Sequence, residues 1–361
     1  MNTRVIAFYL PQYYPTKEND EWWSKGFTEW TNVGRAKPLF KVHYQPKVPA
    51  DLGYYDLRLP EVREEQAILA KEAGIEGFCY WHYWFNGQRL LDRVFTEVVE
   101  TGHPDFPFCL CWANHSWYKK NWDPTMPNVM LMEQTYPGVE DYTNHFIALI
   151  KAFKDERYIK VRGMPVFGIF APQDIPDFCI MRDTWDKLAK ENGLPGIYFF
   201  GFTYEEKYVD AIKTMGMNSA VFDYMLSSLR IREKYAITKV IRKIRQTFGF
   251  ANTMDYKEYS KLTLKQINED KFVNPCIVPN FDHSPRSGNK HVIITNSEPV
   301  NFGKLCSDVI KLRQSIDDED NFLFIKAWNE WGEGNYMEPD IKYGKGYISA
   351  LKKAINTNYK Q

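Results

Sequence analysis

Two glutamates near the C-terminus, Glu330 and Glu333, lie in the segment FIKAWNEWGEG. Chemistry at a glycosidic bond usually needs two carboxyl groups, one to protonate the departing oxygen and one to act as base or nucleophile. On a regular strand, residues three apart point to opposite faces, but Gly332 and Gly334 would let the backbone leave the strand and turn both side chains inward. We therefore predict a catalytic pair whose shared pocket drives the two pKa values apart. A solvated glutamate-rich turn is the structural alternative.

Polar and aromatic side chains also follow the other apolar runs of the chain. Their types suit a sugar, because hydroxyl groups bond to carboxylates and amides while the apolar face of a pyranose stacks on an aromatic ring. For each of them, a role in the core or in a loop is the alternative. The predicted substrate-binding residues are Tyr9, Glu29, Trp30, His82, Tyr83, Trp112, Asn114, Asp123, Asn280, Asp282, Arg286, Asn329 and Trp331.

Short apolar runs that alternate with helical patterns are typical of βαβ units. Strands are predicted over 5–9, 77–85, 107–113, 164–170, 197–202, 220–225, 275–279 and 322–327. Helices are predicted over 60–73, 90–101, 139–153, 181–191, 301–315 and 346–355. Eight such units favour an α/β fold of the (β/α)8 barrel (TIM) type, whose active site lies at the C-terminal ends of the strands. An open doubly wound sheet is the alternative.

No linker rich in Pro, Gly or Ser divides the chain, so we predict one catalytic domain over residues 1–361 with long loops after strands one and six. The second loop holds a basic helical insertion, 227–250, with seven basic residues and one acid. Its apolar stripe either packs on the barrel or, through 230–245, contacts an anionic membrane surface or a lipid-linked glycan. The stripe consists of Ile237, Val240, Ile241, Ile244 and Phe248.

The composition of the chain excludes several classes of function. The 46 basic and 46 acidic residues give no net charge, which argues against a nucleic-acid binder. The 24 Phe, 23 Tyr and 11 Trp suit a site that stacks on flat, amphipathic ligands. Metalloprotease, P-loop, α/β-hydrolase and dinucleotide-binding motifs do not occur, so neither a metal nor a cofactor is predicted.

The six cysteines show no zinc spacing, and we predict buried free thiols. The N-terminal sequence shows no signal-peptide pattern, and no apolar run is long enough to cross a membrane. The chain as given is therefore expected in the cytoplasm.

Four segments resemble the WbsX-type family, which is related to the family 99 glycoside hydrolases, the endo-acting α-mannosidases and mannanases. They are AFYLPQYYPTKENDEWWSKGFTEWTNV, GFCYWHYWF, PFCLCWANHSW and AWNEWGEGNYMEPDIKYGKGY, and the resemblance spans essentially the whole chain. NEWGEG is the most specific part. Two positions depart from the pattern: His115 stands where an acid often follows Trp-Ala-Asn, and Tyr13-Tyr14-Pro15 stands where Phe-His-Pro is frequent. Both departures put the sugar specificity in doubt and leave the glutamates untouched.

The resemblance implies a role for each glutamate. Glu330 would take the proton of the sugar's 2-hydroxyl, whose oxygen then attacks the anomeric carbon to give a 1,2-anhydro sugar. Glu333 would protonate the departing glycosidic oxygen and then activate water or an acceptor hydroxyl. Configuration is retained, and the mechanism uses no metal or cofactor.

Residues and resemblance together predict a retaining glycoside hydrolase or transglycosidase that acts on an α-linked, mannose-like sugar of a polysaccharide or glycan. The first alternative is a glycosyltransferase of O-antigen, lipopolysaccharide or capsule biosynthesis. The absence of a signal peptide favours this alternative, whereas the absence of a DxD strand end favours the hydrolase. The second alternative is a non-catalytic carbohydrate-binding protein, which would have no use for the pair. An oligosaccharide or polysaccharide is the predicted partner in each case.

Overall fold

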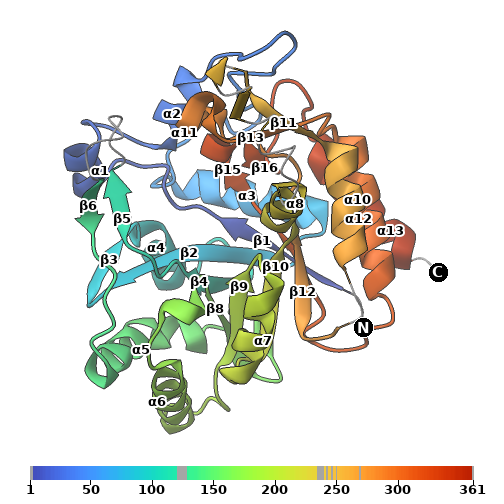
Figure 1. Ribbon diagram of the computed structural model, residues 1–361. Helices are drawn as coiled ribbons and strands as arrows, with labels where there is room; N and C mark the ends of the chain where they lie inside the picture. Colours follow the sequence, from blue (N-terminus) through green and yellow to red (C-terminus); the bar gives the residue numbers. More distant parts are fainter. Residues whose placement is uncertain are drawn as a thin grey trace.

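Eight parallel strands close into a barrel in the computed structural model, which describes residues 3–359 except 120–127, 234–239, 241–242, 245–246, 249 and 268–269 (Figure 1). Each strand pairs with the next, and the last pairs with the first, so the predicted barrel is confirmed and the open sheet is wrong. The strands are β1 (Arg4–Tyr9), β2 (Gly77–Phe85), β4 (Phe108–Trp112), β8 (Met164–Ile169), β9 (Tyr198–Thr203), β10 (Ser219–Asp223), β12 (Val273–Ile277) and β14 (Phe322–Ile325).

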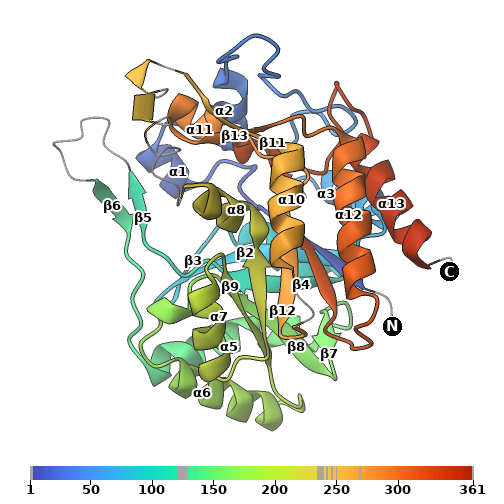
Figure 2. The ribbon, with the colours of Figure 1, turned by 45° about the vertical axis from the view of Figure 1, so that its right-hand side comes forward.

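Helices cover the outside of the barrel in both views (Figures 1 and 2). Proline in the first turn fixes where α3 and α12 begin, and Gly74 in the left-handed conformation ends α3. The last helix, α13, packs against α12 and α3. The helices are α3 (Pro60–Ala73), α4 (Arg93–Thr101), α5 (Val139–Lys154), α6 (Phe178–Glu191), α7 (Glu206–Thr214), α8 (Tyr224–Glu233), α10 (Tyr256–Gln266), α12 (Pro299–Arg313) and α13 (Gly346–Tyr359).

The helix predicted from residue 90 begins three residues later. Asn86 and Gly87 both have positive φ, and a turn of this kind folds the chain back as a hairpin. Residues Gln88–Leu90 therefore form β3, antiparallel to β2, before α4 starts.

The long loops at the C-terminal end of the barrel contain further short elements. After β1 come α1 (Lys17–Trp22) and α2 (Glu29–Arg35), and after β4 comes a hairpin of β5 (Trp117–Lys119) and β6 (Val129–Met132) that projects from the barrel (Figure 2). Lys119 Nζ donates a hydrogen bond to the Trp22 carbonyl at 2.8 Å, which joins the hairpin to α1. The remaining elements at this end are η1 (Pro172–Asp174), β11 (Asn252–Asp255), α11 (Ser284–Ser287), η2 (Gly288–Lys290), β13 (Val292–Thr295), β15 (Asn329–Glu330), η3 (Trp331–Glu333) and β16 (Asn335–Tyr336). The short strand β7 (Lys160–Val161) instead pairs with the beginning of β8, at the N-terminal end of the barrel.

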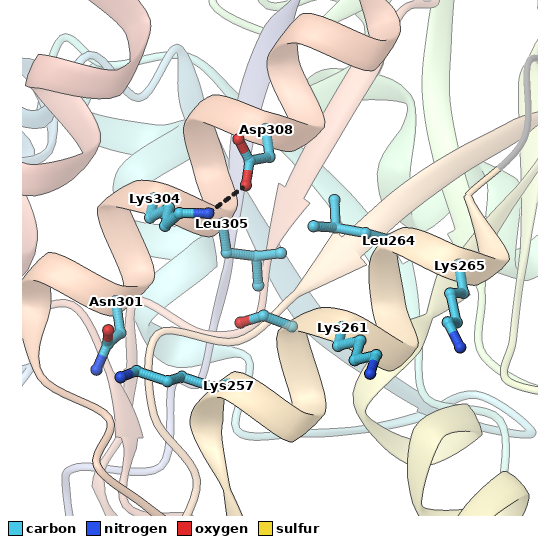
Figure 3. A pocket seen from close by; sticks show the side chains of 9 residues that line it. Lys257, Lys261, Leu264, Lys265, Asn301, Lys304, Leu305 and Asp308 are labelled. Atoms are coloured by element: carbon cyan, nitrogen blue, oxygen red, sulfur yellow. Dashed lines mark hydrogen bonds and ion pairs between the residues drawn. The ribbon is translucent and has the colours of Figure 1, made fainter.

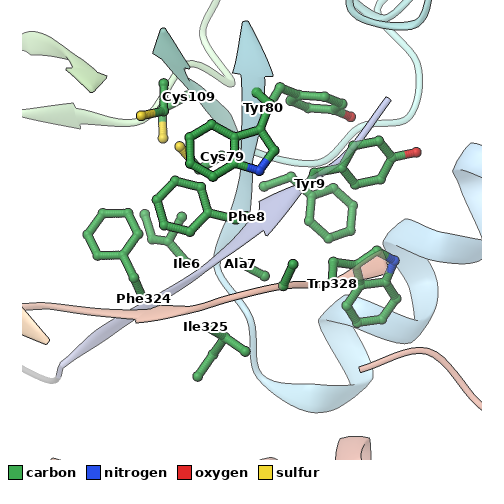
Figure 4. Packing of buried hydrophobic residues seen from close by; sticks show 14 of the residues in the cluster. Ile6, Ala7, Phe8, Tyr9, Cys79, Tyr80, Cys109, Phe324, Ile325 and Trp328 are labelled. Carbon is green, nitrogen blue, oxygen red and sulfur yellow. The ribbon is translucent and has the colours of Figure 1, made fainter. Parts of the chain in front are cut away.

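The interior of the barrel is filled by aromatic rings and thiols (Figure 4). The ring of Phe8 lies 4.6 Å from that of Trp81 and 5.4 Å from that of Phe324. The six cysteines are free thiols and five are buried, as predicted, but Cys179 on α6 is exposed. Burial raises the pKa of the Cys79 thiol well above its usual value, which makes that thiol unreactive.

Gly168 on β8 has no room for a side chain. A Cβ at this position would lie 2.1 Å from Phe200 Cζ and 2.8 Å from Cys111 Sγ. Because overpacking a core costs about 1–3 kcal/mol, we expect Gly168→Ala to lower the free energy of unfolding by about 2 kcal/mol in urea denaturation. The control is Gly34→Ala on α2, where nothing lies within 4 Å and alanine favours the helix. Equal losses in the two variants would contradict this account.

The basic insertion is described in part. The described members of its apolar stripe, Val240, Ile244 and Phe248, are 56%, 52% and 73% exposed, so these side chains do not pack on the barrel. Ile237 and Ile241 lie outside the described residues. Within the described part of the chain, no helix has the length and apolar character that a bilayer span requires.

Candidate active site

The glutamate turn, residues 328–334, follows β14 at the C-terminal end of the barrel. It contains one turn of 3-10 helix (Trp331–Glu333) and ends at Gly334, whose φ is +52°. A Cβ on Gly332 would lie 1.8 Å from a carboxylate oxygen of α2, so the close approach requires glycine. The tight turn brings Glu330 and Glu333 to the same side, which a regular strand would not allow.

One guanidinium group lies against three carboxyl groups. Arg286 Nη1 lies 2.6 Å from Glu333 Oε1 and 3.8 Å from Glu330 Oε1, and Arg286 Nε lies 3.1 Å from Glu29 Oε2. The side chain of Glu29 is 5% exposed, that of Glu330 9% and that of Glu333 16%. The two Oε1 atoms of the glutamate pair can therefore be no farther apart than the sum of their distances to Nη1. All three carboxyl groups are largely shielded from water.

The pKa values of the two glutamates are shifted in opposite directions. Burial raises the pKa of Glu330 to about 7, and the negative charge of Glu333 adds to this effect. Burial would also raise the pKa of Glu333, but the charges of Arg286 and Lys326 override it and lower that pKa to about 2. Glu330 therefore keeps a proton to a higher pH than Glu333 does, the kind of separation that acid–base catalysis needs.

Lys326 is a second cation of the site, which the sequence analysis missed. Its Nζ lies 3.5 Å from Oδ2 of the buried Asp223. Although burial opposes the charged form, the carboxylate of Asp223 holds the pKa of Lys326 above its usual value. The sequence feature that could have indicated Lys326 is its position at the end of the apolar run FLFIK, where a barrel strand ends.

A buried carboxyl group lies behind the glutamate turn. Glu338 accepts hydrogen bonds from Trp331 Nε1 at 2.6 Å, Gln66 Nε2 at 2.6 Å and Tyr55 OH at 2.9 Å. Tyr9 OH donates to Gln66 Oε1 at 2.7 Å. Burial raises the pKa of Glu338 to about 7. This network fixes the indole ring of Trp331. Tyr9 and Trp331 therefore stabilise the glutamate turn from behind.

Asp282 holds a second loop against the turn. Its Oδ2 accepts a hydrogen bond from Gln45 Nε2 at 2.6 Å and lies 2.8 Å from His43 Nε2. Its backbone N–H donates to the Glu333 carbonyl at 2.7 Å. Although burial opposes ionisation, His43 and the nearby Lys47 hold the pKa of Asp282 well below its usual range. His43 belongs to the loop after β1, and its ring is buried against Asp282.

Two predicted amides join backbone segments around the turn. Asn329 accepts from the Leu10 N–H at 2.8 Å and donates to the Leu10 carbonyl at 3.0 Å. Asn280 makes the same pair of bonds to Tyr336, each at 3.2 Å. Trp30 donates its indole N–H to a backbone carbonyl of the loop after β1 at 2.7 Å. All three side chains therefore position the loops that carry the glutamates.

Alternation along β2 sends Tyr83 toward the glutamates and His82 away from them. Burial raises the pKa of Tyr83, and the charge of Glu330 contributes to the shift, which reflects their proximity. His82 Nε2 lies 2.8 Å from Nε2 of His145 on α5, in the layer between barrel and helices. Burial lowers the pKa of His82 to about 3, so this histidine is neutral.

The end of β4 is held by two predicted residues. Trp112 is fully buried, and its indole N–H donates to the Trp84 carbonyl at 3.1 Å. Asn114 bonds to both the N–H and the carbonyl of Ala171 at 2.8 Å. Asp123 lies outside the described residues. Of the predicted contacts, the structure brings Glu29, Tyr83 and Arg286 to the glutamate pair.

Aromatic rings in the loops after β1, β4 and β8 are partly exposed, and Trp117 among them contacts the buried Tyr83 of β2. The ring of Tyr83 lies 5.1 Å from Trp117 on the β5–β6 hairpin, and Trp117 lies 5.7 Å from Trp22 on α1. Phe170, after β8, lies 5.4 Å from the ring of His115. Such rings offer flat apolar faces to a sugar. In the sequence, the many tryptophans of the loops after β1 and β4 are the feature that could have indicated these aromatic contacts.

A cavity of about 510 Å³ lies elsewhere, between α10 and α12 on the outside of the barrel (Figure 3). Lys257, Lys261 and Lys265 of α10 line it, with Lys304 of α12 opposite. Nothing of the glutamate turn reaches this cavity. Over the ranges that the structure describes, no group of three or more His, Cys, Asp or Glu side chains is arranged to hold a metal ion.

Solved structures with the same barrel include glycoside hydrolases. Two structures of the GH99 endo-alpha-mannosidase from Bacteroides thetaiotaomicron superimpose with TM-scores of 0.56 and 0.59, at 13% and 12% identity, over 99% of this chain and 97% and 98% of theirs. A glycoside hydrolase-like protein gives a TM-score of 0.62 at 13% identity, over 98% of this chain and 94% of that one. At this identity the likeness establishes the fold. This chain and those proteins therefore share a (β/α)8 barrel.

The chain belongs to the WbsX glycosyltransferase family, whose sequence pattern matches residues 5–351. The resemblance seen in the sequence is therefore confirmed. Two curated relatives, from two strains of Xanthomonas campestris pv. campestris and both called uncharacterized protein WxcX, are 33% identical over 357 residues, or 97% of this chain. The chain spans about half, 49%, of the length of these relatives. Family and fold together indicate an enzyme that processes glycans.

Proposed function

We propose that the protein is a retaining glycoside hydrolase or transglycosidase that acts on an α-linked, mannose-like sugar of a glycan through Glu330 and Glu333. The observation that carries this proposal is the guanidinium of Arg286, which lies against both glutamates while their pKa values fall on opposite sides of the usual value. Cleavage of a glycosidic bond usually requires one carboxyl group that donates a proton and a second that acts as base or nucleophile.

In the proposed reaction, the protonated glutamate gives its proton to the glycosidic oxygen as the bond to the anomeric carbon breaks. The ionised glutamate takes the proton of the 2-hydroxyl, whose oxygen attacks the anomeric carbon from the opposite face. Water or an acceptor hydroxyl then opens the 1,2-anhydro sugar, and two inversions give retention. Attack from the opposite face needs a 2-hydroxyl trans to the leaving group, which α-mannosides have and α-glucosides lack. The proposed route therefore requires a sugar with the mannose configuration at the 2-position.

The test is turnover of α-linked aryl glycosides and manno-oligosaccharides without any nucleotide, with nucleotide-sugar donors assayed in parallel. Wild type is compared with Glu330→Gln, Glu333→Gln and the control Glu65→Gln, a change of an exposed carboxylate on α3. Release that stops on oligosaccharides in both site variants and continues in the control supports the proposal. Release that is indifferent to both glutamates contradicts it.

A glycosyltransferase of O-antigen, lipopolysaccharide or capsule assembly is the second candidate, and the name of the family favours it. Transfer only from a nucleotide sugar, with both glutamates dispensable, would establish this activity. A carbohydrate-binding protein would bind the same oligosaccharides without turnover, and Glu333→Gln would then change only the affinity.

We also propose that the insertion contacts an anionic membrane surface. Its described apolar side chains are exposed, and the segment 230–245 carries seven basic residues. We expect the double change Ile244→Ser, Phe248→Ser to weaken co-sedimentation with phosphatidylserine vesicles about tenfold or more, because burial of each large apolar side chain contributes about 1.5–3 kcal/mol.

The control for this experiment is the double change Ile147→Ser, Ile180→Ser, which removes exposed isoleucines from α5 and α6. It should leave vesicle binding unchanged. Failure of the wild type to bind anionic vesicles even at low salt would sink the membrane proposal.

A further inference from the structure

We infer that Lys326 is a substrate-binding residue, whose ammonium group donates a hydrogen bond to one hydroxyl oxygen of the bound sugar and so helps to determine which sugars the site accepts. The inference rests on the proposed function and concerns the same site. It gives Lys326 no part in proton transfer.

The fold places Lys326 inside the barrel, at the end where the glutamate turn lies. The ring of Phe324 on β14 lies 5.4 Å from that of Phe8 in the barrel interior (Figure 4). The N–H of Lys326 continues the strand ladder by donating to the Ile277 carbonyl at 2.9 Å. Because side chains two apart on a strand point to the same face, Lys326 also faces the interior, closer to the turn than Phe324 is.

Lys326 is about as accessible as the glutamate pair. Its side chain is 11% exposed, compared with 9% for Glu330 and 16% for Glu333. Burial opposes the charged form of Lys326, but the carboxylates of Asp223, Glu333 and Glu330 together hold its pKa above the usual value, which reflects their proximity. A sugar that contacts the two glutamates therefore comes close to the ammonium group.

The ammonium group of Lys326 lacks hydrogen-bond acceptors. Its one hydrogen bond within the described part of the chain is a long contact of 3.5 Å to Asp223 Oδ2. The other oxygen of Asp223 accepts from the N–H groups of Met225 and Leu226 at 2.9 and 3.0 Å, and these bonds hold the carboxylate in place. An ammonium group has three N–H donors, and a buried charge without partners is costly. An oxygen of the substrate would supply the missing acceptor.

The surroundings of Lys326 favour a neutral hydroxyl group as this acceptor. Asp223 and the two glutamates bring several carboxyl groups to the same place, and these oppose the entry of a uronate or phosphate group. Glu330 Oε2 also has no hydrogen-bond partner among the described residues. A hydroxyl group suits this setting, because it accepts from the ammonium and donates its own proton to a carboxylate oxygen.

The test combines one lysine substitution with the removal of single hydroxyl groups from the ligand. Calorimetry measures the binding of an S-linked α-mannobioside, which resists hydrolysis, and of analogues that each lack one hydroxyl group. In the wild type, one analogue should bind about 10- to 100-fold more weakly than the parent, the usual effect of losing a hydrogen bond to a charged donor. In Lys326→Met the parent should bind as weakly, and the same analogue should lose nothing further.

The inference is overturned if every analogue loses the same factor of affinity in the wild type and in Lys326→Met. A structural role of the lysine is tested with Asp223→Asn, which removes the ion pair but keeps the ammonium and an oxygen for the backbone of α8. This variant should bind the parent mannobioside almost as well as the wild type. Equal losses in Asp223→Asn and Lys326→Met would reduce Lys326 to a partner of the aspartate and overturn the inference.

Two further variants complete the design. Lys345→Met, the same change at an exposed lysine 2.9 Å from Glu72, should leave binding unchanged. If Lys326→Met does not fold, the double variant Lys326→Met, Asp223→Asn replaces it in the comparison, because removing both members of a buried ion pair is better tolerated than removing one.

The inference and the proposed function fail in different ways. A wild type that shows the lysine-dependent pattern of binding but releases no sugar would overturn the proposed reaction and support the role of Lys326. A Lys326→Met variant that keeps the wild-type kcat/KM on manno-oligosaccharides would overturn the role of Lys326 and leave the reaction standing. A wild type that binds none of these ligands would overturn both.

Discussion

Replacement of Glu333 by glutamine is expected to lower kcat/KM on oligosaccharides by at least about 10³-fold, within the range that general acid–base catalysis contributes. Glutamine keeps the shape of the side chain and an oxygen that accepts from Arg286 Nη1. It removes the negative charge and the capacity to exchange a proton with the substrate. The loss should therefore appear in kcat, because the change spares the packing around the site.

The matched control is Glu65→Gln, the same substitution at an exposed carboxylate outside the site, which should leave kcat/KM unchanged. Thermal unfolding of both variants near the wild-type temperature would show that the fold is intact. A Glu333→Gln variant that keeps more than a tenth of the wild-type kcat/KM would remove this glutamate from the chemistry.

Replacement of Arg286 by methionine is expected to lower the free energy of unfolding by about 3–5 kcal/mol at neutral pH, the usual cost of leaving a buried charge without its partner. Glu29 and Glu333 would both lose their cation. Because Arg286 holds the folded-state pKa of Glu333 at about 2, its contribution is present above the unfolded pKa, near 4.5, and disappears as the pH falls toward 2. The difference between wild type and variant should shrink over that window in denaturant titrations.

Two further variants sharpen this prediction. Arg286→Lys should recover part of the stability, since an ammonium keeps the charge but not the two-sided contact. Arg93→Met removes a half-exposed arginine that pairs with Glu97 on α4, and it should cost less than about 1 kcal/mol. A loss for Arg286→Met that is no larger than that for Arg93→Met would mean that the three carboxyl groups do not depend on the guanidinium.

The barrel was predictable because its strands are buried on both faces and appear as apolar runs between helical patterns. β2 extends over 77–85, the predicted range, and β14 covers most of the predicted range. The predicted start of α4 was wrong because the Asn86–Gly87 turn is followed by the short strand β3, which apolar periodicity does not reveal. The helix α7 went unpredicted.

The sequence allowed the prediction that Glu330 and Glu333 lie close together, because Gly332 and Gly334 indicate a break in the strand. The rest of the site depends on contacts between distant segments. Arg286 and Glu29 are far apart in sequence, and no local pattern says that they meet. The same is true of His43 with Asp282 and of Glu338 with Gln66, whose buried networks hold the turn.

The most direct test of the central claim, that the glutamate pair performs retaining glycosidic chemistry, is proton NMR of the anomeric signals during hydrolysis of an α-linked manno-oligosaccharide by the wild type. We predict that the α-anomer of the released sugar appears first and that the β-anomer grows in only by mutarotation. First appearance of the β-anomer would mean inversion, and it would contradict the 1,2-anhydro route and the proposed chemistry of the Glu330–Glu333 pair.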